Sequence, residues 1–268
     1  MKILIFGDLY GRVGRKALKK ELPGLKDKFN PDFVVVNVEN VTSGRGPIEK
    51  HVLEIEALGV DVMTGGDHIF DNEAKIKDYI EKKDSKLIRP ANFYETIDYP
   101  VFGKGYKIVE KGGKKLLVIH LIGEVFMRYC VVNPFLKVEE ILKEFQDVEF
   151  DGIIVDFHKE ATAEIAAMSF FLDSKASFVY GTHTHVQTND EVVLPGGTGH
   201  ISDIGMTGPF PSVIGADFGS VRKRFLTGLG KGKIEQSLIN SYVVSGVCVE
   251  IEERKCKSIE KIRIRGKL

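Results

Sequence analysis

Metal-binding types of side chain follow five short apolar runs of this 268-residue chain. They are Asp8 after ILIFG, Glu39 and Asn40 after VVVNV, Asp67 and His68 after VDVMTGG, His158 after IIVDF, and His183 and His185 after FVYGT. Carboxylate oxygen mixed with imidazole nitrogen suits manganese, iron, zinc or related ions better than calcium or magnesium. His183 and His185 are two residues apart, so on an extended backbone both rings point to the same side and could serve two neighbouring metals.

Each of these residues, taken alone, has an ordinary structural explanation. An aspartate after a strand, such as Asp8, is commonly a turn or helix N-cap residue. A buried histidine such as His158 is commonly a hydrogen-bonded core residue, and Glu39 is compatible with a polar loop. Buried strands that all end in such groups, however, would leave unpaired charge clustered at one edge without cations. The combination therefore favours metal binding over the separate explanations.

The elements that must position these residues are strands alternating with helices. Short apolar, β-branched runs, typical of strands buried on both faces, are residues 3–6, 33–36, 60–63, 116–119, 153–155 and 178–180. A helical stripe at Val138, Ile141, Leu142 and Phe145 predicts one helix, and residues 48–58, which end before Gly59, predict another. This alternation predicts an α/β layered core, in which ligands bind at the carboxyl ends of the strands.

Two predicted hairpins make the sheets mixed rather than purely parallel. Residues 105–110 turn into 115–120, and residues 242–251 turn into a strand around 262–264. Residues 195–241 are rich in Gly, Pro and Ser and predict a long glycine-rich loop region, which in a compact domain is usually functional. No repeat, linker or low-complexity tract divides the chain, so we expect a single domain over residues 1–268.

Composition limits the partners and the compartment. Lys+Arg and Asp+Glu both number 38, so we expect no stable nucleic-acid complex and no membrane association. The apolar start meets Asp8 too early for a signal peptide or a membrane span. Three cysteines without CxxC spacing indicate neither a disulfide framework nor a zinc–thiolate site, and favour a cytoplasmic protein. Apolar residues such as Phe210 are compatible with a homo-oligomer or with core packing.

Glycine spacing argues against a nicotinamide cofactor. Gly7, Gly11 and Gly14 are spaced as GxxxGxxG, not as the dinucleotide-binding GxGxxG, and no GK[ST] follows. His120 and His200 are further candidates for the lining of the pocket or for contact with the metal ligands.

With these residues assembled, the chain resembles the calcineurin-like metallophosphoesterase superfamily, and more closely its YmdB-type branch. The matching segments run almost end to end: IFGDLYGRVGR, VVNVEN, GGDHIFDN, RPAN, IVDFHKEAT, YGTHTHVQTND and ISDIGMTGP. The resemblance implies a four-layer α/β/β/α sandwich of mixed sheets and a dinuclear metal centre, with iron as the first expectation and manganese or zinc as alternatives. It also implies hydrolysis of small phosphodiesters such as 2′,3′-cyclic nucleotides.

The resemblance assigns a role to each matching position. It implies that Asp8 and His185 hold one metal and that Asp67, His158 and His183 hold the other. Glu39 would bridge the two metals, Asn40 would lie beside the bridge, and His68 would face the leaving group. The superfamily pattern begins DxH, whereas this chain has Tyr10 at the third position, so the first metal lacks a usual histidine ligand.

Two features depart from the pattern of the branch. Asp67 stands where Asn is usual, so two divalent ions with three carboxylates leave a charge of about +1 instead of about +2. We therefore expect weaker attraction of a phosphate dianion, or preference for a more highly charged metal. His120 and Glu124 stand where relatives carry Asn and Arg, and loss of that arginine would remove a phosphate clamp.

The expected activity is that of a metal-dependent phosphoric ester hydrolase. Two cations a few ångströms apart lower the pKa of a bridging water enough to supply hydroxide, and they neutralise charge on the phosphate. His68 would protonate the leaving alkoxide, and Asp71 would either hold the imidazolium or cap a helix. The alternative is a metal-binding regulatory protein whose partner interactions matter more than hydrolysis.

Overall fold

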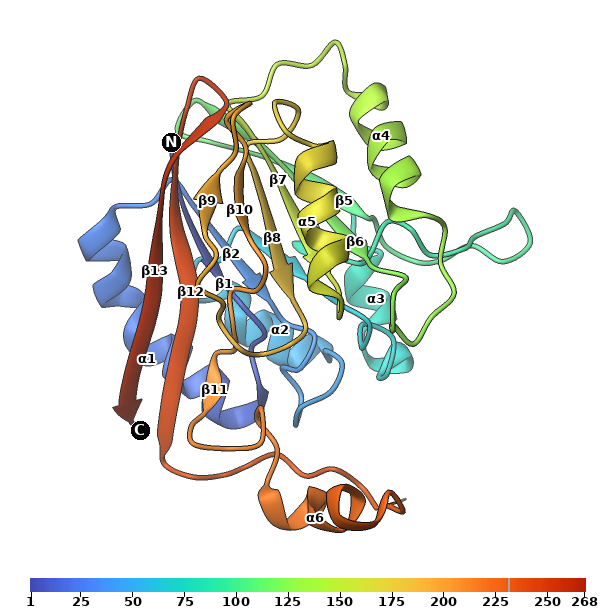
Figure 1. Ribbon diagram of the computed structural model, residues 1–268, viewed down its shortest axis with the longest axis vertical. Coiled ribbons are helices and arrows are strands. Elements are labelled where there is room, and N and C mark those ends of the chain that lie inside the picture. The colour runs from blue at the N-terminus through green and yellow to red at the C-terminus, as the bar shows by residue number, and fades with distance from the viewer. Residues whose placement is uncertain (231) are drawn as a thin grey trace.

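The apolar runs of the sequence form strands in two sheets of the computed structural model, which describes residues 1–230 and 232–268 (Figure 1). The strands of the first sheet are β1 (Lys2–Phe6), β2 (Phe33–Asn37), β3 (Val62–Thr64), β4 (Leu87–Ile88), β11 (Gly208–Pro209), β12 (Ser241–Glu252) and β13 (Lys255–Lys267). The strands of the second sheet are β5 (Tyr106–Lys111), β6 (Lys114–Ile122), β7 (Gly152–His158), β8 (Phe178–Thr182), β9 (Val192–Val193) and β10 (Gly199–Ile201).

Both sheets are mixed: antiparallel strands flank the parallel strands on one side in the first sheet and on both sides in the second. The first has the order β11-β12-β1-β2-β3-β4 with β13 on β12, and β1 to β4 run parallel. The second has the order β5-β6-β7-β8-β10-β9, and β6, β7, β8 and β10 run parallel. The two predicted hairpins are β5–β6 and β12–β13. Because parallel strands end at the same edge, the loops after β1, β2 and β3 lie together, as do those after β7 and β8.

Helices cover the outer faces of both sheets, which gives four layers. The helices are α1 (Gly11–Phe29), α2 (Glu49–Glu56), α3 (Lys77–Ile80), α4 (Pro134–Glu144), α5 (Thr162–Phe171) and α6 (Phe218–Thr227), with a 3₁₀ turn at Glu73–Lys75. Apolar side chains of α1 and α2 pack on the first sheet, and those of α4 and α5 pack on the second. The α/β/β/α sandwich expected from the resemblance is therefore confirmed.

Successive side chains of β1 point to opposite faces of the first sheet and so pack in different layers. Leu4 and Phe6 pack under α1, whereas Ile3 and Ile5 face the second sheet and contact a core that includes Val118 of β6. Each is fully buried, and burial of such a side chain contributes roughly 1.5–3 kcal/mol. Apolar packing on both faces therefore fixes where the strand ends, and so where Asp8 emerges.

Two segments contain helices or strands that the sequence patterns did not predict. The glycine-rich segment after β1 is the start of α1, where Gly14 allows close packing because a Cβ there would lie 2.4 Å from the carbonyl oxygen of Thr207. The stretch 195–241, expected to be a long loop, contains β10, β11 and α6, while its position 231 lies outside the described residues. Figure 1 shows α6 at one end of the molecule, away from the helices that cover the sheets. Among the described residues, no helix has the length and apolar character needed to cross a bilayer.

Candidate metal centre

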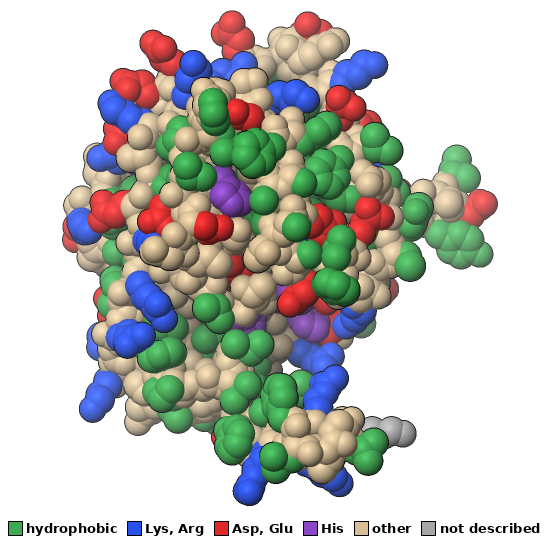
Figure 2. Space-filling model, in the orientation of Figure 1, with side chains coloured by type: hydrophobic (Ala, Val, Ile, Leu, Met, Phe, Trp, Pro, Cys, Tyr) green, Lys and Arg blue, Asp and Glu red, His purple; other side chains and the backbone are tan. Residues whose placement is uncertain are grey.

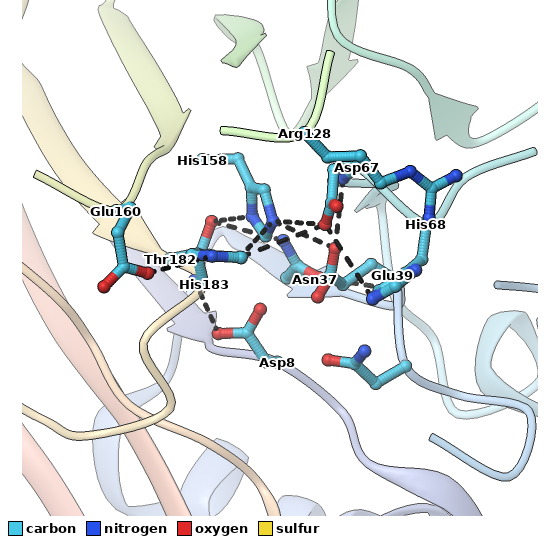
Figure 3. A network of polar contacts seen from close by, with 12 residues as sticks. Asp8, Asn37, Glu39, Asp67, His68, Arg128, His158, Glu160, Thr182 and His183 are labelled. Atoms are coloured by element: carbon cyan, nitrogen blue, oxygen red, sulfur yellow. Dashed lines mark hydrogen bonds and ion pairs between the residues drawn. The ribbon is translucent and has the colours of Figure 1, made fainter. Parts of the chain in front are cut away.

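Carboxylate and imidazole groups from the two sheets converge at their carboxyl-terminal edge. Figure 3 shows Asp8, Glu39, Asp67, His158 and His183 pointing toward one another. They form two groups whose ligand atoms lie within 4.8 Å of one another: Glu39, Asp67, His158 and His183 in the first group, and Asp8, Glu39 and His185 in the second. Every carboxylate of these groups follows a strand of the first sheet, and every imidazole ends or follows a strand of the second. Glu39 belongs to both groups.

His158 has one ring nitrogen aimed at the centre of the first group. Its Nε2 lies 2.9 Å from Glu39 Oε2, 3.3 Å from Asp67 Oδ1 and 3.1 Å from His183 Nδ1. The Thr182 hydroxyl donates to Asp156 at 2.8 Å, so its oxygen accepts from His158 Nδ1–H at 2.9 Å. Nδ1 therefore carries a proton. Burial opposes a second proton, but the Glu39 and Asp67 carboxylates raise the pKa of His158 well above its ordinary value, so a cation bound at Nε2 would displace the proton there. A lone pair that faces three other electron-rich atoms fits a cation between them.

His183 has a similar arrangement around its other nitrogen. Its Nε2 lies 3.1 Å from Glu160 Oε2, so Nε2–H donates to that carboxylate and Nδ1 faces His158. A carboxylate on the outer nitrogen of a metal-binding histidine orients the ring and increases its basicity. Burial lowers the pKa of His183 to about 4, so the ring is neutral at pH 7 and able to bind a cation.

Asp8 is the clearest sign of missing positive charge in the second group. Its Oδ2 accepts from the His183 backbone N–H at 3.2 Å, but its buried Oδ1 has no hydrogen-bond partner among the described residues. Burial and the neighbouring Glu39 raise the pKa of Asp8 well above its ordinary value. An unpaired buried carboxylate is costly, and a bound cation would remove that cost.

His185 directs one nitrogen toward the second group. Its Nδ1–H donates to the carbonyl oxygen of Ile214 at 2.7 Å, and its Nε2 lies 2.9 Å from Asn40 Oδ1. Nε2 and Oδ1 are both electron-rich when Nδ1 carries the proton, so this contact also fits a cation nearby. The ring of Tyr10 packs edge-on against His185 at 5.6 Å between centroids and occupies the place of the absent histidine in the DxH pattern.

The turn that carries His183 and His185 is not extended, in contrast to the sequence expectation. Their φ angles are +105° and +65°, a region that non-glycine residues rarely adopt. The turn is held by Asp203, whose Oδ2 accepts from the Thr184 backbone N–H at 3.0 Å and from its hydroxyl at 2.8 Å. This strained turn sends one ring to each group instead of both to the same side.

The position of the Glu39 carboxylate depends on a neighbouring glycine. Gly66 has a φ of +61°, and a Cβ on it would lie 2.0 Å from Glu39 Oε2. The neighbouring Asp67 backbone N–H donates to that same oxygen at 3.1 Å. Although burial opposes ionisation of Asp67, contact with His158 lowers the pKa of Asp67, so its carboxylate is charged. The donor set and its close packing therefore fit metal ions.

His68 lies beside the two groups but belongs to neither. Its Nδ1 is 2.8 Å from Asp71 Oδ2, and its Nε2 is 4.0 Å from Asp67 Oδ1. Asp71 therefore contacts the imidazole, and Asn72, not Asp71, precedes the following 3₁₀ turn. Arg45 and Arg128 each lie 3.1 Å from the same Asp71 carboxylate. Sequence reasoning missed both arginines, because no fixed spacing links them to Asp71.

His120 and His200 have positions that differ from the pocket lining considered for them. His120 is fully buried behind the centre, where its Nε2 accepts from the Gly66 backbone N–H at 2.8 Å and supports the turn before Asp67. His200 contacts Ser169 at 2.7 Å and lies outside both groups. Asp203, which sequence reasoning did not select, also follows a strand, but β10 is only the short segment Gly199–Ile201 and contains His200, so it lacks the apolar run that marks the other carboxylates.

A cavity of about 810 Å³ lies beside the two groups. It is lined by Glu39, His183 and His185, by His68 and Arg45, and on its other side by α6. Figure 2 shows histidine side chains at this recess, between the body of the molecule and the α6 segment. A small molecule could reach the candidate metal ligands from this side.

Comparison with known proteins gives matches over nearly the whole chain. A family model described as "YmdB-like protein" matches residues 4–262. A "2′,3′-cyclic-nucleotide 2′-phosphodiesterase" of Bacillus subtilis (strain 168) is 39% identical over 270 residues, covering 98% of this chain and 96% of that protein. A crystal structure described as a novel phosphatase from Mycoplasma pneumoniae has a TM-score of 0.90 and 33% identity, covering 100% of this chain and 94% of that one. A hypothetical protein from Thermus thermophilus also has a TM-score of 0.90, with 30% identity and 99% coverage of both chains.

Proposed function

The chain belongs to the YmdB-like protein family and is a phosphoric ester hydrolase, and from this premise we propose that it hydrolyses 2′,3′-cyclic nucleotides or related phosphodiesters at a dinuclear metal centre. The observation that carries the proposal is the shared carboxylate: Glu39 lies in both groups of candidate ligands. One carboxylate between two donor sets is the arrangement expected when two cations lie a few ångströms apart.

The proposed ligands divide between two positions. Asp8, Asn40 and His185 hold one cation, Asp67, His158 and His183 hold the other, and Glu39 contacts both. The mixture of carboxylate oxygen and imidazole nitrogen suits iron, manganese or zinc, and the family resemblance makes iron our first choice among them. When bound, such a pair supplies Lewis acidity toward water and toward phosphate oxygens.

His68 is the proposed general acid. Its Nδ1 is held by Asp71 at 2.8 Å, and the ring lines the cavity, which leaves Nε2–H of the imidazolium for the leaving group. Water adds to phosphorus and releases one proton to solvent, the bond from phosphorus to a ribose oxygen breaks, and that oxygen takes the Nε2 proton, which His68 regains from solvent before the next turnover. Asp71 positions the ring and stabilises its positive charge.

The test combines metal analysis with three substrates. Wild type, His158→Ala and the control His51→Ala, a histidine on α2 outside both groups, are assayed with 2′,3′-cyclic AMP, an aryl phosphodiester and an aryl phosphomonoester. We expect two metal equivalents and diester hydrolysis in wild type and the control, and loss of both in His158→Ala. Folded wild type that carries its metal and hydrolyses none of the three would favour the regulatory alternative.

A further inference from the structure

The cavity beside the metal ligands is too large for a phosphate group alone. Its volume is about 810 Å³, and pockets of roughly 300–1,000 Å³ accommodate whole drug-sized ligands. The candidate ligands and His68 line one side, so the reacting phosphate must lie there. The remaining volume extends toward α6 and is available to the organic part of a substrate.

One face of α6 forms the far wall of this cavity. Val221, Arg224 and Phe225 line it, and their spacing of three and four residues puts them on the same side of the helix. Ile214 and Ile234 add aliphatic surface next to them. The wall thus combines an aromatic ring, a guanidinium and flat aliphatic surface.

Phe225 is unusually exposed for an aromatic residue. It lines the cavity and is 72% exposed, so most of the ring surface is free of packing within the protein. The Arg224 side chain makes no ion pair within residues 1–230 and 232–268. An exposed ring beside a free guanidinium suits a flat heteroaromatic ligand with hydrogen-bond acceptors, because bases stack on aromatic side chains and on arginine planes.

We propose that α6 is the base-binding wall of the active site, where Phe225 stacks on the nucleobase and Arg224 contacts its acceptor atoms. This inference rests on the proposed function for the phosphate end of the substrate. It assigns the occupant to the substrate, and not to a second copy of the chain, because the wall is continuous with the cavity that holds His68 and the metal ligands. The site thereby prefers nucleotides over phosphodiesters that lack a base.

The test compares a nucleotide with its base-free analogue in the metal-loaded protein. kcat/KM is measured for 2′,3′-cyclic AMP and for methyl riboside 2′,3′-cyclic phosphate in wild type, Phe225→Ala and Phe225→Tyr. Leu226→Ala is the matched control, because Leu226 is also 72% exposed but does not line the cavity. Stacking of a base on an aromatic side chain predicts that Phe225→Ala lowers the ratio of the two kcat/KM values roughly 5- to 150-fold. Phe225→Tyr and Leu226→Ala should keep the wild-type ratio.

Three results would overturn the inference. The first is an unchanged ratio of kcat/KM values in Phe225→Ala, and the second is an equal fall of that ratio in Leu226→Ala. The third is a smaller mass of Leu226→Ala in analytical ultracentrifugation, together with an equal loss of activity on both substrates. That third result would assign α6 to contact with a second copy of the chain. If wild type hydrolyses neither substrate, the proposed function fails by itself. The inference is then tested separately by calorimetry, which measures the affinities for 5′-AMP and for ribose 5-phosphate. Phe225→Ala must lower the ratio of the first affinity to the second.

Discussion

Replacement of Asp71 by asparagine removes one charge and almost no volume beside the proposed general acid. Asp71 Oδ2 lies 2.8 Å from His68 Nδ1, and its side chain is 11% exposed, so water does not fully screen the pair. A hydrogen bond to a charged group contributes about 1.5–3 kcal/mol, against about 0.5–1.5 kcal/mol for a neutral one. The difference, about 1–1.5 kcal/mol, corresponds to a rate about 5- to 13-fold lower. Arg45 and Arg128 already share the charge of Asp71, so we expect a value near five-fold.

The assay separates protonation of the leaving group from other effects. With 2′,3′-cyclic AMP the leaving oxygen is an alkoxide that needs a proton, so His68→Ala should lower kcat by roughly 10²–10⁴ and Asp71→Asn by about five-fold. With an aryl diester whose leaving group is p-nitrophenolate, little protonation is needed and both variants should be close to wild type. Asp78→Asn makes the same chemical change on the exposed surface of α3 and should leave both substrates unaffected.

The result that would refute this reasoning is an equal loss on both substrates. Asp71 and His68 would then act in substrate binding or in folding, and not in proton transfer. Loss of metal in His68→Ala would refute it differently, because the ring would then be a ligand. Metal content is therefore measured on every preparation that is assayed.

Further predictions concern the metal ligands, the charge of the centre and the response to acid. Thr182→Val removes the oxygen that accepts from His158 Nδ1–H, so chelator competition should show metal affinity about 10- to 100-fold lower; unchanged affinity would contradict the assigned tautomer. Asp67→Asn removes a negative charge near the substrate phosphate while leaving metal bound, so inhibition by inorganic phosphate should strengthen, and an unaltered inhibition constant would count against the charge argument. Burial raises the pKa of Asp190, but hydrogen bonds, first from Ser202, lower it from 3.8 to about 2. The ionised carboxylate therefore stabilises the folded protein fully above pH 3.8, and this stabilisation is lost as the pH falls toward about 2. The difference in urea midpoint between wild type and Asp190→Asn should therefore be full at pH 6 and shrink as the pH approaches about 2; a constant difference would exclude the carboxylate as its cause.

Local sequence pattern was sufficient to predict that the candidate metal ligands lie close together. Buried apolar runs predicted the parallel strands, and parallel strands in one sheet end at a common edge, so Asp8, Glu39 and Asp67 had to lie near one another. The same rule applies to His158 and to the turn after β8. What the pattern did not contain was the way the two sheets face each other, which came from the family resemblance.

Among the helices that the sequence patterns did not predict, α1 and α6 were missed for different physical reasons. Helix α1 lacks a side-chain cap at Tyr10, contains Pro23 and starts among glycines, so its local signals oppose the helix that packing on the first sheet stabilises. Helix α6 did carry local signals: Asp217 caps its start by accepting from the Ser220 backbone N–H at 3.0 Å, and Gly228 ends it with a φ of +67°. Its place among glycine and proline residues obscured them.

Contacts between distant segments could not be read from spacing at all. Arg45 and Arg128 reach Asp71 from segments that lie 26 and 57 residues away in the sequence. Their convergence depends on how loops from both sheets fold over the edge. The positive φ angles at His183 and His185 could not be predicted from spacing either. Such backbone strain is tolerated only where surrounding contacts, here those of Asp203, impose it.

All carboxylates of the two candidate groups emerge from the first sheet, and all imidazoles from the second. A chain in which only one sheet has formed offers a single donor type: oxygen alone, which hard ions prefer, or nitrogen alone. The mixture of oxygen and nitrogen donors, which favours transition metals over calcium or magnesium, therefore forms only when the two sheets pack together. If the proposed centre is correct, its preference among ions is a property of the packed tertiary structure, and neither sheet would have it alone.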